Sequence, residues 1–93
     1  MHYDSERREV VGDARTTVPL TGLMARMMNV LFERRGQYVP WDALIWSIYR
    51  GGGPENPHNT LTVTLCNLRG RFRDAGIPCP VVVRPGHGMM WES

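Results

Sequence analysis

Apolar residues between positions 59 and 75 recur at steps of three and four, the spacing of one face of an α-helix. The residues that share this face are Leu61, Leu65, Leu68 and Phe72. Gly76 favours the end of the helix, because glycine readily adopts the left-handed conformation that closes many helices. The pattern therefore predicts a helix over residues 59–75, capped by Asn59 or Thr60, with one face in a core.

The same periodicity predicts two shorter helices upstream, near residues 21–35 and 40–50. Gly36 is expected to end the first, and the glycines that begin at position 51 are expected to end the second. The first helix carries a stripe rich in methionine. This stripe is expected to fill the core, because methionine adapts its shape to irregular gaps.

Short runs with a preference for β-structure lie on both sides of the helices. Arg7–Val11 and Arg15–Leu20 flank Gly12-Asp13, a turn signal, and together predict a hairpin. A second hairpin is predicted near residues 80–92, with its turn at Pro85-Gly86-His87-Gly88.

The predicted order of elements is β-β-α-α-α-β-β. Residues 1–6 are expected to form a flexible tail, which leaves residues 7–93 as a single domain. The expected fold class is α+β, with three helices, a short N-terminal hairpin and a C-terminal β-hairpin. This is the arrangement of a winged helix-turn-helix domain, in which the last hairpin is the wing.

The composition is that of a globular domain with one core. The chain has 93 residues, of which 42% are hydrophobic. No apolar run approaches the roughly 20 residues that a membrane span requires. The N-terminus lacks the apolar centre of a signal peptide. We therefore expect a cytoplasmic location.

The distribution of charge is more informative than the net charge of +2. All 11 basic residues are arginine, a bias that a GC-rich genome also explains. From Arg50 to Arg84 there are five arginines against two acidic residues, a net charge of +3. Arginine suits phosphate groups and guanine edges better than lysine does, so this half of the chain favours a nucleic-acid partner.

Residues with catalytic or metal-binding chemistry form no recognisable set. Cys66 and Cys79 are far apart and lack the spacing of zinc ligands. The three histidines, His2, His58 and His87, do not cluster in sequence. Nucleophile elbows, phosphate loops and paired carboxylate motifs are also missing. We expect a protein that is not an enzyme and that holds neither a metal nor a cofactor.

Several segments match a known pattern. Asn59–Arg69, N-T-L-T-V-T-L-C-N-L-R, follows the pattern N-T-V-D-V-H-I-S-R-L-R, and Val82–Gly88 matches a wing. Val18–Thr21 matches the entry to a first helix, and Gln37–Leu44 with Ile48-Tyr49 match a second helix. In these segments the chain resembles the DNA-binding effector domains of OmpR/PhoB-type response regulators, which implies a winged helix-turn-helix fold.

The layout and the resemblance together predict sequence-specific binding of double-stranded DNA by a small stand-alone transcriptional regulator of bacterial or phage origin, acting as a homodimer or in tandem. The helix 59–75 is expected in the major groove and the hairpin 80–92 on the minor groove. The residues expected to contact bases are Thr60, Thr64, Asn67 and Arg71. The residues expected at the DNA backbone are Arg50, Arg69 and Arg73, and Arg84 is expected in the minor groove.

One alternative stays open, a winged-helix module that binds RNA polymerase or another transcription protein and has weak or no DNA binding. Thr62, Thr64 and Asn67 stand where the family often has Asp, His and Arg, which dilutes the charge of the helix. The apolar end Met89-Met90-Trp91 would serve a protein partner if it were exposed.

Overall fold

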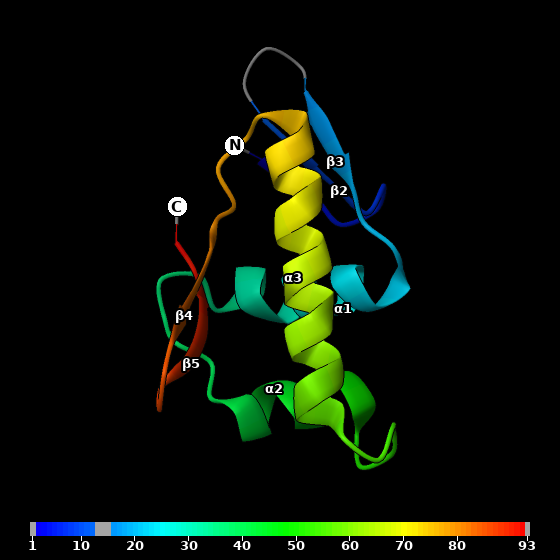
Figure 1. The fold of residues 1–93 in the computed structure, drawn as a ribbon, viewed down its shortest axis with the longest axis vertical. Helices are drawn as coiled ribbons and strands as arrows, with labels where there is room; N and C mark the ends of the chain where they lie inside the picture. The colour runs from blue at the N-terminus through cyan, green and yellow to red at the C-terminus, as the bar shows by residue number, and fades with distance from the viewer. Residues whose placement is uncertain (1, 13–15, 93) are drawn as a thin grey trace.

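The computed structural model describes residues 2–12 and 16–92 and has the expected α+β architecture (Figure 1). The elements are β1 (His2–Asp4), β2 (Glu9–Val11), β3 (Thr17–Pro19), α1 (Gly22–Glu33), α2 (Trp41–Tyr49), α3 (Pro57–Ala75), β4 (Val81–Arg84) and β5 (Gly88–Trp91). The long helix α3 crosses in front of α1 and α2, with the N-terminal strands near its C-terminal end and the β4–β5 hairpin along one side (Figure 1).

The N-terminal sheet has three strands, where the sequence predicts one hairpin behind a flexible tail. Residues 2–4 of that tail form β1, which pairs antiparallel with β2 and places Tyr3 opposite Val10. The predicted hairpin is present as β2 and β3, with Val10 opposite Val18, while its turn at residues 13–15 lies outside the described residues. A strand of three residues shows no periodicity, so the burial of Tyr3 against the helices was not predictable from its neighbours.

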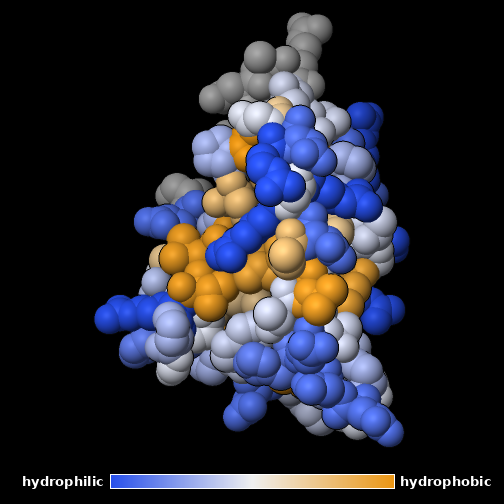
Figure 2. All heavy atoms as spheres, in the orientation of Figure 1, coloured by the Kyte–Doolittle hydropathy of each residue, from blue (hydrophilic) through white to orange (hydrophobic). Residues whose placement is uncertain are grey.

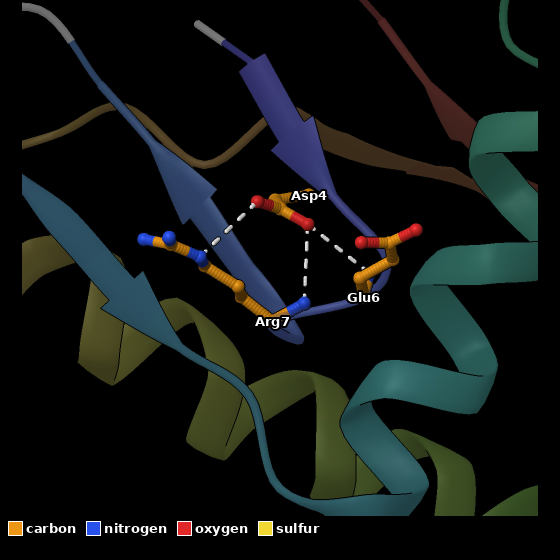
Figure 3. Close-up of polar contacts among 3 residues, drawn as sticks. All are labelled: Asp4, Glu6 and Arg7. Carbon is orange, nitrogen blue, oxygen red and sulfur yellow. Dashed lines mark hydrogen bonds and ion pairs between the residues drawn. The ribbon is translucent and has the colours of Figure 1, made fainter.

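The turn between β1 and β2 is organised by Asp4 (Figure 3). One carboxylate oxygen accepts hydrogen bonds from the backbone N–H groups of Glu6 and Arg7, each at 3.1 Å. The other oxygen lies 4.0 Å from Nε of Arg7. Aspartate commonly holds a turn in this way, because its short side chain reaches the N–H groups two and three residues on. Residues 2–6 of the tail expected from sequence therefore belong to a hairpin.

The three helices pack around one core. The helices α1 and α2 lie within their predicted ranges, and the methionine-rich stripe of α1 is buried as expected. The apolar stripe of α3 is also buried as predicted. No helix in the described part of the chain is long and apolar enough to cross a membrane.

The C-terminal hairpin is fixed to the core rather than projecting freely. Val39 and Met89 exchange backbone hydrogen bonds at 2.6 and 3.0 Å. Trp91 packs against Phe32 and Tyr3, with ring centroids 5.1 and 5.8 Å apart. Gly88 permits this approach, because a Cβ there would overlap the carbonyl group of Val39. Met89 and Trp91 are fully buried, so they do not supply the exposed apolar end that would have favoured the protein-binding alternative.

Candidate nucleic-acid interface

Local sequence signals fix both ends of α3. The helix begins at Pro57, two residues earlier than predicted, and Asn56 is the N-cap in place of Asn59 or Thr60. The Asn56 side chain accepts a hydrogen bond of 3.1 Å from the N–H of Asn59, and proline suits the first turn because its missing N–H needs no partner there. Gly76 ends the helix in the left-handed conformation, with φ of 73°.

The solvent side of α3 is centred on a stripe of small and apolar residues. The outward stripe consists of Asn59, Val63, Cys66 and Gly70, spaced at steps of four, three and four. Val63 is 51% exposed. A Cβ placed on Gly70 would meet the Arg73 guanidinium at 3.8 Å, which is ordinary contact, so the middle of the helix is open to a partner.

The four residues expected to contact bases do not share one accessible surface. Asn67 is exposed and Thr60 is half-buried, with its hydroxyl donating to the Asn56 carbonyl at 3.1 Å. Thr64 is only 9% exposed, and its hydroxyl donates to the Thr60 carbonyl at 2.8 Å. Arg71 is half-buried and donates from Nη1 to the carbonyl of Pro19 in β3 at 2.9 Å. Three of the four side chains thus make hydrogen bonds within the protein, and Thr64 is also buried.

Helix geometry explains why Thr64 faces inward. Successive residues are about 100° apart around the axis, so a residue flanked by Leu61, Leu65 and Leu68 at steps of three, one and four lies on the core side. The prediction placed Thr64 on the outer face because it is polar and follows Thr60 at a step of four. Val63 and Cys66 were not among the residues predicted to face outward, although the direction opposite the leucine stripe identifies them.

Arg69 and Arg73 flank the outward stripe on the side of the hairpin. They help to line a groove of about 530 Å³, here called the α3–wing groove. Its lining residues are Trp41, Thr62, Leu65, Cys66, Arg69, Gly70, Arg73 and Val83. Figure 2 shows the corresponding surface, with hydrophobic patches at mid-height beside hydrophilic side chains.

Arg69 also lies near the thiol of Cys79, which precedes β4. Burial raises the pKa of this thiol above its usual value, and a backbone hydrogen bond at Val81 and the charge of Arg69 oppose the rise. The guanidinium of Arg69 therefore sits where α3 meets the segment that leads into the hairpin.

The wing arginine is placed at the tip of the hairpin. Arg84 is exposed and is the last residue of β4, directly after Val83 of the α3–wing groove. Its carbonyl accepts a hydrogen bond of 3.0 Å from the N–H of His87, which closes the turn. Arg69, Arg73 and Arg84 thus belong to the neighbouring elements α3 and β4.

Arg50 occupies a different place from the other arginines expected at DNA. It follows the last residue of α2 and lines a groove formed with α1, to which no residue of α3 contributes. Among residues 2–12 and 16–92, no three His, Cys, Asp or Glu side chains gather closely enough to hold a metal ion.

A solved structure shares this arrangement of elements. The chain is similar to the DNA-binding domain of Klebsiella pneumoniae RstA, crystallised in complex with the RstA box, with a TM-score of 0.73 and 22% identity. The superposition covers 97% of this chain and 88% of that one. The fold is a winged helix-turn-helix. The predicted fold class and the resemblance in fold to an OmpR/PhoB-type effector domain are confirmed.

The two other comparisons gave no relative. No protein-family model matches the chain, and no curated protein matches it. The winged helix-turn-helix arrangement is therefore supported by structure, and the individual contacts must be argued from the residues of this chain.

Proposed function

We propose that the protein binds double-stranded DNA sequence-specifically, as a small stand-alone transcriptional regulator, with α3 in the major groove and the β4–β5 wing on the minor groove. One observation carries the proposal. The open, solvent-facing side of α3 is flanked by Arg69 and Arg73, and the wing beside it ends in Arg84. The likeness to a domain crystallised with its DNA box supports the same function.

The proposed contacts fall into two classes, contacts of α3 with base edges and contacts of arginines with the DNA backbone. Asn67, exposed on α3, bonds an adenine edge through its amide, and Thr60 lies two turns before it. Val63 supplies an apolar contact suited to a thymine methyl group. Thr64 and Arg71 have no part in this set, because the protein buries the first and bonds the second to Pro19.

Arginines at the edges set the position of the protein on the duplex. Arg69 and Arg73 bind phosphates beside the major groove, contacts that fix register without selecting a sequence. Arg84 enters the minor groove, where A·T-rich DNA concentrates negative potential. A module of this size buries roughly 600–1,000 Å² on DNA, so two copies on adjacent half-sites are proposed to provide the specificity.

The test is fluorescence anisotropy with a labelled pool of random duplexes at two salt concentrations. Each phosphate contact removed should lower the slope of log K against log salt by about one. Arg73→Ala is the test variant, and Arg35→Ala is the control of equal charge. Arg35 is stacked over Phe32 at 4.6 Å, outside the α3–wing groove. Equal slopes for the two variants would contradict the proposed orientation, and absence of duplex binding would contradict the function.

The protein-binding alternative keeps one supporting observation, the exposed Val63 beside an apolar part of the α3–wing groove. On that alternative Val63→Ser abolishes binding of a protein partner, while duplex binding is weak for every variant. Salt-dependent duplex binding that Arg73→Ala weakens separates the two functions, because exposed arginines contribute little to fold stability.

A further inference from the structure

A second groove lies between α1 and α2, and its volume is about 570 Å³. This α1–α2 groove is lined by Arg26, Asn29, Val30, Glu33, Arg34, Trp46, Ser47, Ile48 and Arg50. No residue of α3 or of the hairpin lines it, and α1 and α2 lie behind α3 in Figure 1. DNA bound to α3 therefore leaves this groove accessible.

Positive charge dominates the α1–α2 groove. Arg26, Arg34 and Arg50 are exposed, and Glu33 is the single acidic residue of the lining. Within residues 2–12 and 16–92, no carboxylate lies within 4.0 Å of these three guanidinium groups. Guanidinium groups bind carboxylates in planar, bidentate pairs, so three of them around one hollow suit a ligand with several carboxylates.

Trp46 gives the same hollow an apolar side. The residue is 63% exposed. A Cβ on Gly51 would lie 3.2 Å from its ring, so the indole rests against the turn after α2. A large exposed aromatic beside arginines is the composition of the strongest contact sites in protein interfaces.

Arg50 occupies the groove at a conformational cost. It adopts the left-handed conformation, with φ of 52°, at the C-cap of α2, although glycines follow at positions 51, 52 and 53. A side chain in this conformation is strained relative to glycine, because its Cβ approaches the following carbonyl oxygen. Strain of this kind is concentrated at functional sites. Arg50 supplies a guanidinium group to the groove, which glycine would not.

We infer that the α1–α2 groove binds an acidic segment of a partner protein that carries one bulky apolar side chain. The carboxylates pair with Arg26, Arg34 and Arg50, and the apolar side chain packs on the indole of Trp46. The site is separate from the DNA surface, so the partner and the duplex bind together.

Two other occupants fit less well. A nucleic-acid backbone would meet the Glu33 carboxylate in the lining, which would repel its phosphates. A second copy of this chain offers the acidic turn at Asp4, but that carboxylate already accepts two backbone hydrogen bonds. That turn also carries Arg7 and Arg8.

The test uses a dye-labelled peptide of alternating Glu and Asp around one central Phe, titrated with the protein and followed by anisotropy. Arg34→Ala should weaken binding about tenfold, the effect of roughly one lost charge-assisted contact. Arg35→Ala is the matched control. It removes the same charge at the next residue, which does not line the groove, and should leave peptide binding unchanged. Equal losses in the two variants would show general charge attraction and overturn the inference.

Location and ligand class are tested separately. In ¹⁵N NMR spectra the peptide should shift the indole N–H of Trp46 and the amides of Arg34 and Arg50, but not those of α3. Shifts confined to α3, or none, overturn the inference. Peptides with Gln for Glu and Asn for Asp, or with Ala for Phe, should bind more weakly. A single-stranded oligothymidine that binds the groove more tightly than the acidic peptide also overturns it.

Arg50→Gly separates a ligand role from a structural one. This substitution removes the charge and relieves the left-handed strain, so peptide affinity should fall about tenfold while the melting temperature stays equal or rises. A lower melting temperature with unchanged peptide binding assigns Arg50 to the fold and counts against the inference. None of these outcomes depends on duplex binding. Failure of the DNA proposal would appear in the duplex measurements alone and would leave the peptide measurements unchanged.

Discussion

The α3–wing groove and the α1–α2 groove have nearly the same volume, about 530 and 570 Å³, yet their linings differ. The first joins an apolar floor around Leu65 and Val83 to two arginines at its edge. The second places three arginines and an exposed tryptophan around a polar hollow. The two linings differ in chemistry rather than in size, which is why we propose a duplex for the first groove and an acidic peptide for the second.

Both grooves depend on the same core. α3 packs on α1 and α2 through the leucine stripe that ends with Phe72, and α1 packs directly on α2. A change in this core should therefore damage both surfaces at once, while a change at either surface should affect that surface alone.

The largest effect is expected from Leu68→Ala, which removes a fully buried side chain from the centre of the core. The loss should be roughly 2–5 kcal/mol in the free energy of unfolding, from lost transfer energy and the remaining cavity. Urea unfolding followed by circular dichroism measures it. Val63→Ala, at an exposed position of the same helix, should change stability by less than about 0.5 kcal/mol. Similar losses in both variants would mean that the stripe does not face the core.

The core was predictable because its signal is periodic along one helix. The spacing of Leu61, Leu65, Leu68 and Phe72 specifies a face whatever the rest of the fold does. Thr64 was misplaced because a polar side chain can lie at the edge of an apolar face. Helix position, and not polarity, decides where it points.

Other features depend on elements that are distant in the chain. Tyr3 forms a strand because its ring packs with Phe32 and Trp91, which lie in α1 and β5. The α1–α2 groove combines Arg26 and Arg34 with Arg50, and only the packing of two helices brings them together. Neither arrangement leaves a local pattern in the sequence.

The second effect in size concerns specificity on the α3 side. Asn67→Ala should cost about 1–3 kcal/mol at the preferred site and should relax preference at one A·T pair. Competition binding with duplexes that carry single base-pair changes measures this. Thr64→Ser, at a buried position, should leave preference unchanged. If Asn67→Ala weakened matched and mismatched duplexes alike, Asn67 would be a backbone contact.

A smaller effect should appear on the α1–α2 side. The Tyr3 hydroxyl hydrogen-bonds to the side chain of Asn29, which lines that groove. Tyr3→Phe should cost about 0.5–1.5 kcal/mol of stability, the usual contribution of one such bond. It should weaken the acidic peptide more than the duplex, because the two groups that it frees, the Asn29 side chain and the Ala25 carbonyl, both belong to α1. Equal changes in both affinities would contradict this assignment.

Tyr3 should also make the stability of the protein fall at alkaline pH. Burial is the main cause that raises the pKa of its hydroxyl above the usual value of 10.0. The folded state therefore holds the proton more tightly than the unfolded chain does. The resulting stability is complete below the unfolded pKa and is lost as pH rises through the folded pKa. Urea unfolding from neutral to alkaline pH should show a decline near and above pH 10 that Tyr3→Phe reduces.

The smallest expected effect is a change in the rate at which a cysteine thiol is labelled, which leaves the fold intact. Cys66 is exposed in the α3–wing groove, whereas Cys79 is half-buried with a raised thiol pKa and so has less thiolate at neutral pH. Because the thiolate is the reactive form, Cys66 should react first with a disulfide reagent. Bound duplex should slow its labelling, and the acidic peptide should not. Cys66→Ser, which leaves only the slow reaction of Cys79, is the control. Protection of Cys66 by the peptide would mean that both ligands use the α3 surface, and the distinction between the two grooves would be lost.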